Sequence, residues 1–175
     1  MSDFVQTMSN WAEKKSSWLL LFLSTLGLQL AALYFQYGLD KSPCVMCIYQ
    51  RTAVYGILLS ALLVVLVNNS FTRMLAFAGW AVSAVWGFML AHEHVDIIYA
   101  PNPFFAICPF EPNFPSWLPL HEWIPAIFAA PGSCTDNSWL FLDLGMAEWM
   151  RIIFAIYVAL FAFVFMCRLL TKKPF

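Results

Sequence analysis

The sequence predicts an all-α membrane protein, a four-transmembrane-helix bundle with a long, partly irregular outer loop, in a single domain over residues 1–175. Hydrophobic residues make up 62% of the chain and charged residues 11%, whereas a soluble domain carries about 25% charged residues. The charges also cluster, which leaves four apolar runs near the roughly 20 residues that a spanning helix needs. Runs of this length disfavour a soluble fold, and the near-neutral chain has no basic stripe that would suit nucleic acid.

The apolar runs give the expected helices, which cover about 18–37, 47–67, 74–91 and 149–169. The first run follows Lys14 and Lys15 and could be taken for a signal peptide. It is too long for a typical signal-peptide core and has no small-x-small motif at its end, so we expect it to be a retained helix.

Positively charged residues predict the orientation, because Lys and Arg in short loops mark the cytoplasmic side. Such residues occur before the first helix, between the second and third, and after the fourth, on one side of an even-numbered bundle. They are Lys14, Lys15, Arg73, Arg168, Lys172 and Lys173. Positions 74–150 contain no Lys or Arg, and Lys41, Arg51 and Arg151 are the exceptions on the other side. We therefore expect a multi-pass protein of a bacterial inner membrane, with both termini cytoplasmic.

Two segments are expected to face outward, about 38–46 and 92–148. The second contains many prolines, which forbid a long helix. Within it, Ser116–Ala129 carries tryptophans among aliphatic residues. Tryptophan is favourable at the headgroup level, so this stretch is expected to lie flat on the membrane. The alternative is a loop packed on the top of the bundle.

Four of the five cysteines fall in the outward segments. Cys44 and Cys47 form a Cys-x-x-Cys in the short one, and Cys108 and Cys134 lie in the long one. The outer side of a bacterial inner membrane is an oxidising compartment in which disulfides persist. Cys167, at the inner end of the fourth helix, is expected to be an apolar filler or an inert thiol without a functional role.

A Cys-x-x-Cys indicates either metal binding or redox chemistry. A structural zinc site needs compact ligand pairs, but Cys108 and Cys134 are far apart in sequence, although His92 and His94 could supply ligands. Haem attachment would need His after the second cysteine, where the sequence has Ile48. Redox chemistry is therefore the favoured interpretation, and no metal site is expected.

The position of Cys47 supports this interpretation. It follows Pro43 and falls in the first turn of the expected second helix, where free backbone amides favour an anion. Arg51 is four residues later on the same helix face, and a nearby cation also favours the nucleophilic thiolate. The alternative is that Arg51 extends its side chain to the lipid headgroups. His94, at the end of the third helix, should lie at the same depth and could offer a proton or hydrogen bond, although it could also be simply solvated.

The motif Cys44-Val-Met-Cys47-Ile-Tyr-Gln-Arg51 resembles that of the DsbB family of disulfide bond formation proteins. The resemblance covers nearly the whole chain. It includes the four expected helices, Glu93-His94 at the end of the third, and a separated cysteine pair in the second outer loop. The combination is specific, although a Cys-x-x-Cys by itself would be a weak signal.

The resemblance implies a protein-dithiol:quinone oxidoreductase with ubiquinone or menaquinone as cofactor. In such a protein, Cys44 and Cys47 would be the cysteine pair next to the quinone, with the Cys47 thiolate contacting the ring. Arg51 and His94 would line that ring.

The resemblance also implies a role for the loop pair. Cys108 and Cys134 would exchange with a periplasmic DsbA-like thioredoxin-fold partner, with Cys108 forming the mixed disulfide. Two alternatives stay open at this point. One is a paralogue that serves a dedicated partner, and the other is a membrane scaffold or metal-binding protein whose cysteines form structural disulfides.

Overall fold

A computed structural model describes the chain except residues 1–5, 7–9, 11, 102–107, 110 and 172–175. Four long helices dominate it, and each is long and apolar enough to cross a membrane. They are α2 (Lys15–Gly38), α3 (Val45–Leu66), α4 (Ser70–Ile98) and α7 (Met146–Thr171). The predicted all-α, four-span architecture is therefore confirmed.

Helix α4 is longer at both ends than its hydropathy suggested. It begins earlier because Asn69 caps it: the Asn69 side chain accepts from the Thr72 amide at 2.8 Å, and the Thr72 hydroxyl accepts from the Asn69 amide at 3.1 Å. It continues past His92 to Ile98, so the long loop starts seven residues later than position 92. Polar residues lower the hydropathy there without breaking a helix, and the first proline is Pro101.

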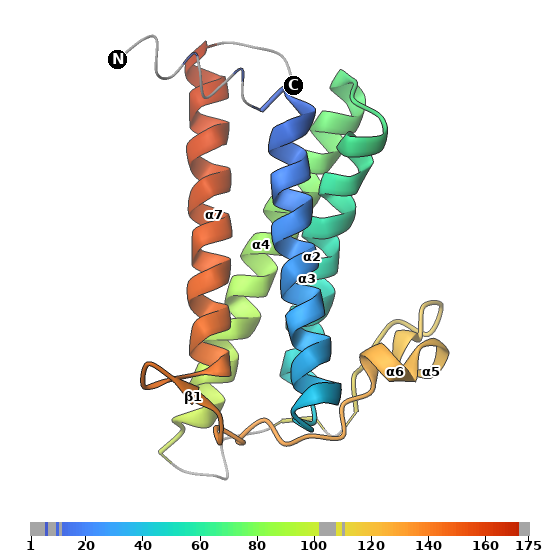
Figure 1. The fold of residues 1–175 in the computed structure, drawn as a ribbon, viewed down its shortest axis with the longest axis vertical. Helices are drawn as coiled ribbons and strands as arrows, with labels where there is room; N and C mark the ends of the chain where they lie inside the picture. The colour runs from blue at the N-terminus through green and yellow to red at the C-terminus, as the bar shows by residue number, and fades with distance from the viewer. Residues whose placement is uncertain (1–5, 7–9, 11, 102–107, 110, 172–175) are drawn as a thin grey trace.

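The helices pack in the order α2, α3, α4 and α7, each against the next, and Figure 1 shows them side by side. Helix α3 is buried over a larger part of its length than the other three long helices, with Ile57 and Ala61 fully buried. Helices α4 and α7 approach closely at Gly87, because any Cβ there would collide with the ring of Phe154. Helices α2 and α7 do not pack closely, although Ser24 and Tyr157 form a hydrogen bond at 3.0 Å, and both helices help to line two cavities.

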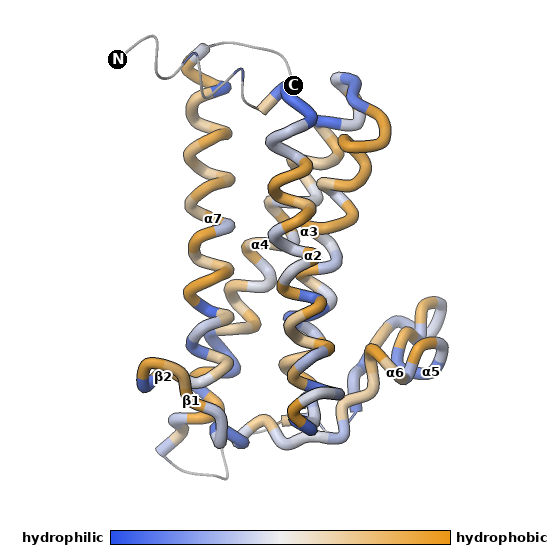
Figure 2. Tube along the Cα trace, in the orientation of Figure 1, coloured by the Kyte–Doolittle hydropathy of each residue, from blue (hydrophilic) through white to orange (hydrophobic). Residues whose placement is uncertain are grey.

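The helices are apolar along most of their length, as Figure 2 shows, and their outward faces expose large apolar side chains. Large side chains such as Leu20, Val82 and Leu170 are 57%, 69% and 68% exposed. A soluble protein would not present such continuous apolar surface. The faces therefore suit contact with lipid.

One end of the bundle carries the start of α2, the turn between α3 and α4, and the end of α7 (Figure 1). Lys14, Lys15, Arg73 and Arg168 lie at this end, as the charge pattern predicted. Lys172 and Lys173 lie outside the described residues. Arg168 is 1% exposed and pairs with Glu13 at 3.4 Å, which ties the segment before α2 to α7.

The other end carries residues 39–44 and the described part of the long loop, including a small hairpin of β1 (Leu140–Phe141) and β2 (Leu144–Gly145). The predicted interfacial stretch contains α5 (Leu120–Trp123) and α6 (Pro125–Phe128), which stand to one side of the bundle (Figure 1).

The interfacial stretch has one exposed and one packed part. Trp117 and Trp123 are 75% and 61% exposed. At its other end, the Ala126 carbonyl accepts from Gln36 of α2 at 3.1 Å, and Phe128 packs on Tyr55 of α3. The packed-loop alternative thus describes the second part, and membrane contact of the tryptophans stays a prediction.

Candidate redox site

The Cys-x-x-Cys lies at the amino-terminal end of α3, as its spacing predicted. Cys44 is the N-cap, and its sulfur accepts a hydrogen bond from the backbone amide of Cys47 at 3.2 Å. Both cysteines are free thiols, and their sulfur atoms lie 2.6 Å apart. Oxidation to a disulfide would therefore need only a short closing movement.

The two thiols are not equivalent. Cys44 is 2% exposed. The hydrogen bond to the Cys47 sulfur, together with burial, raises the pKa of Cys44 well above its usual range. Cys44 therefore keeps its proton in the reduced pair and donates it toward Cys47. The negative charge of a singly ionised pair falls on Cys47, at the helix N-terminus.

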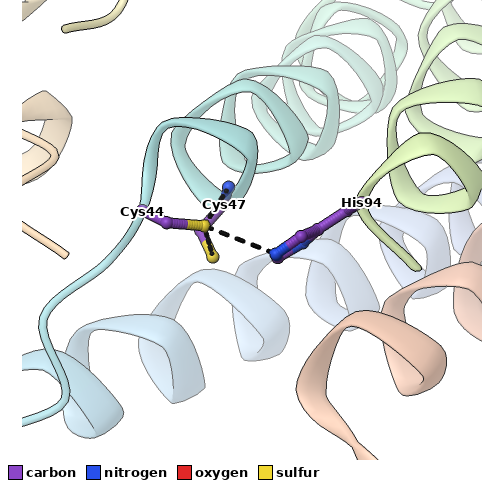
Figure 3. Close-up of side chains that lie close together, drawn as sticks. All are labelled: Cys44, Cys47 and His94. Carbon is purple, nitrogen blue, oxygen red and sulfur yellow. Dashed lines mark hydrogen bonds between the residues drawn. The ribbon is translucent and has the colours of Figure 1, made fainter. Parts of the chain in front are cut away.

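His94 connects this pair to the long loop. Its ring is buried, 4% exposed, and projects from α4 toward the sulfur atoms (Figure 3). The Gln50 amide nitrogen lies 3.2 Å from Nδ1 and can donate to it. This leaves the ring proton on Nε2, which lies 3.2 Å from the carbonyl oxygen of Cys134 and 3.6 Å from the Cys44 sulfur.

The loop cysteines are joined in a Cys108–Cys134 disulfide. Cys134 is 1% exposed, whereas Cys108 is only partly buried. The Gly132 amide donates to the Pro43 carbonyl at 2.9 Å, and a Cβ at Gly132 would collide with the Ser42 carbonyl oxygen. The loop thus approaches the residues before Cys44 closely enough to require glycine.

Arg51 is buried, 6% exposed, one helical turn after Cys47. Its guanidinium donates to the Gln36 side chain at 2.9 Å and to the Ile127 carbonyl. It also acts electrostatically on Cys47. Its side chain therefore points into the protein, toward the loop, rather than away from it toward headgroups.

These groups border a cavity of about 120 Å³ between the helices, at the end of the bundle that carries the long loop. Apolar walls come from α2 and α7, including Leu28, Phe35 and Met150. The helices contribute the polar residues Gln29, Cys47, Gln50, Arg51 and His94, and Cys44 borders the cavity just before α3. Further polar residues come from the segments outside the helices, namely Lys41, Ser42, Ser133, Asp136, Asn137 and Ser138. A second, almost wholly apolar cavity of about 230 Å³ lies further along α2 and α7, near Trp18 and Tyr157.

The structure brings all six predicted site residues to one end of the bundle, in two layers. Cys44, Cys47, Arg51 and His94 border the cavity, and the disulfide of the other two packs against Cys44. Cys167 is buried at the opposite end, in α7.

Sequence reasoning missed three glutamines at the site. Gln29 is 4% exposed and donates to the Arg51 carbonyl at 2.9 Å. Gln36 accepts from the Arg51 side chain, and Gln50 contacts His94. A signal was available, because a polar residue inside a spanning helix marks a functional site by default.

Comparisons with a family model and with known proteins point to the same family. The family model described as "Disulfide bond formation protein DsbB" matches residues 14–164. A relative in Pseudoalteromonas atlantica named Disulfide bond formation protein B is 50% identical over 95% of this chain and 97% of its own. A relative of the same name in Shewanella frigidimarina is 50% identical over 86% of this chain and 89% of its own. Another in Idiomarina loihiensis is 46% identical over 95% of this chain and 94% of its own.

Proposed function

The chain belongs to the DsbB family of disulfide bond formation proteins, and on this premise we propose that it reoxidises a DsbA-like partner and passes the electrons to a membrane quinone. The observation that carries the proposal is the contact of the two cysteine pairs through His94. The ring nitrogen Nε2 lies 3.2 Å from the carbonyl oxygen of Cys134 and 3.6 Å from the sulfur of Cys44. Two separate structural disulfides, as in the scaffold alternative, would not need this contact.

The first step is attack of a partner thiolate on the loop disulfide. Cys108 is the more exposed of its two sulfurs, and access decides which sulfur is attacked. A partner–Cys108 bond forms and the Cys108–Cys134 bond breaks, which leaves Cys134 as a thiolate. The second thiolate of the partner then attacks the partner's own sulfur, so the partner leaves oxidised and Cys108 becomes a thiolate.

The second step passes the electrons to the helix pair in its disulfide form. The Cys134 thiolate attacks the Cys44 sulfur, which packs against it, and the Cys47 thiolate leaves. Cys108 then attacks Cys134, which restores the loop disulfide and releases Cys44. The result is an oxidised loop pair and a reduced helix pair, the same state that the structure describes.

The residues at the cavity fit a quinone headgroup. A quinone ring needs apolar walls and hydrogen-bond donors for its two carbonyl oxygens, and the cavity combines Leu28 and Met150 with Arg51 and His94. The apolar cavity further along α2 and α7 suits a hydrocarbon tail. When bound, the quinone supplies the two-electron acceptor. Cys47 presents the thiolate, Arg51 provides positive charge and donors, and Cys44 closes the disulfide.

Arg51→Ala is expected to raise the apparent KM for quinone by roughly ten- to a hundredfold, because a hydrogen bond from a charged group is worth about 1.5–3 kcal/mol. Arg51→Lys should be milder but still impaired, since Lys lacks the planar donor fork. Steady-state kinetics with a soluble quinone analogue measures this effect.

Arg151→Ala is the matched control. Arg151 lies near the start of α7, at the same end of the bundle as Arg51, but it does not border the cavity. Its KM should equal that of the unmodified chain. An unchanged KM in both Arg51 variants would remove Arg51 from the proposed quinone site.

The proposal includes an orientation, with the cysteine pairs on the periplasmic side of the inner membrane. Ser116 and Ser70 are exposed at opposite ends of the bundle and can report it. In a chain with all five cysteines replaced by Ser, Ser116→Cys should react with a membrane-impermeant maleimide once the outer membrane is permeabilised. Ser70→Cys should react only after the inner membrane is lysed. The reverse labelling pattern would overturn the orientation.

A further inference from the structure

Three potential metal ligands converge at the start of α3. The Cys44 and Cys47 sulfurs and a His94 ring nitrogen all lie within 4.8 Å of one another (Figure 3). The spacing of cysteines along the sequence disfavours a metal site, but it could not reveal this contact. His94 comes from α4 and lies 50 residues after Cys44.

We propose that the reduced Cys44–Cys47 pair and His94 form a binding site for a thiophilic d10 dication, of which Zn²⁺ and Cd²⁺ are the representatives. Two thiolates and an imidazole are the donor set that such ions prefer. Three protein ligands with water in the fourth position is also a common arrangement for zinc. The sulfurs must move apart from their 2.6 Å contact to surround an ion, as a reduced pair is free to do.

Charge balance favours this class of ion in a buried place. Starting from the pair with both thiols protonated, binding breaks two S–H bonds, forms two metal–sulfur bonds and one metal–nitrogen bond, and releases two protons to solvent. Starting from the pair already ionised at Cys47, it breaks one S–H bond and releases one proton. No electron is transferred. A dication with two thiolates and a neutral imidazole carries no net charge, so burial costs little desolvation. Cys44 and His94 are 2% and 4% exposed.

Gln50 can support either state of His94. In the metal-free arrangement its amide nitrogen faces Nδ1 and the ring proton is on Nε2. To bind a metal through Nε2, the ring must carry its proton on Nδ1, and that proton needs an acceptor. A half turn of the Gln50 amide presents its oxygen to Nδ1, which is the kind of support that metal-binding histidines normally have.

Binding would also affect the loop. The Cys134 carbonyl lies 3.2 Å from Nε2 and would lose this hydrogen-bond donor when Nε2 binds the metal. The site is available only when the helix pair is reduced, because a disulfide has no thiolate. The metal would therefore trap the reduced protein and stop its reoxidation; this inhibition rests on the proposed function, whereas the binding does not.

Titration with Cd²⁺ tests the binding directly, through the ultraviolet charge-transfer absorption of cadmium–thiolate bonds. The full chain should carry Cys108→Ser, Cys134→Ser and Cys167→Ser, so that Cys44 and Cys47 are its remaining cysteines. Its reduced form should bind one Cd²⁺ per chain, and its oxidised form should show no band. An equal signal from the two forms would overturn the proposal.

His94→Ala isolates the contribution of the imidazole. It should weaken Cd²⁺ binding by at least about tenfold, whereas His92→Ala on the exposed side of the same helix should bind like the parent. Equal affinity of these two variants would also overturn the proposed site. Since the titration contains neither quinone nor partner, it can fail while quinone reduction succeeds, or succeed while quinone reduction fails.

The inhibition has its own measurement. Zn²⁺ added to the unmodified chain in the reduced state should block its reoxidation, and a chelator should restore it. Reoxidation that proceeds at its full rate with Zn²⁺ bound would contradict the trapping.

Discussion

Cys47→Ser is expected to reduce quinone reduction to the uncatalysed level, roughly a 10⁴-fold loss, because it removes the thiolate that faces the cavity. Cys108→Ser should behave differently when a small dithiol replaces the protein partner. A small dithiol can reach the helix pair directly, so this variant should keep part of its activity. With the protein partner, both variants should be inactive.

This comparison separates the two cysteine pairs by their roles. Cys47 lies at the N-terminus of α3 beside Arg51, and Cys108 lies in the loop disulfide. In the proposed relay, the Cys47 substitution removes the exit of the electrons and the Cys108 substitution removes their entry. Absorbance of the quinone, followed with each dithiol, gives both rates. If the two variants retain equal activity with the small dithiol, the helix pair is not the quinone site.

Cys134→Ser should accumulate a covalent adduct with the partner. The substitution leaves Cys108 as a partly exposed lone thiol, which can exchange with the partner's disulfide. The second thiolate of the partner can only return this adduct to the starting disulfide, and no Cys134 thiolate remains to carry the exchange onward, so the adduct persists at equilibrium. The adduct should appear on a non-reducing gel as a band that dithiothreitol removes.

Cys108→Ser is the matched control for this adduct. It leaves Cys134 as the lone loop thiol, and Cys134 is 1% exposed beside His94. Reactivity of a thiol in exchange follows its access, so we expect about tenfold less adduct than with Cys134→Ser. Equal amounts of adduct in the two variants would show that the partner does not enter at Cys108.

The fold could be predicted well from the sequence, because apolar length alone decides which segments can span a membrane. The helix ends could not, since hydropathy does not register a cap such as Asn69. Hydropathy also does not show that a helix continues through polar residues, as α4 does from His92 to Ile98.

The site could be predicted in part. Local spacing predicts that Cys47 and Arg51 lie one turn apart on the same helix, and in the structure both residues lie in α3. The contact of His94 with both Cys44 and Cys134 depends on the path of a long loop, which no local pattern encodes. Gln50 was part of the recognised motif, but its contact with His94 joins two helices and needs the tertiary structure.

The most direct test of the proposed function is an anaerobic reaction of the purified chain, a quinone analogue and a reduced thioredoxin-fold dithiol. Oxygen is excluded so that quinone is the available electron acceptor. Quinone absorbance and partner thiols are measured together over time. The proposal predicts that one quinone is reduced for each partner disulfide formed, since each is a two-electron couple. Partner oxidation that leaves the quinone unchanged, or a quinone signal that does not depend on the chain, would contradict it.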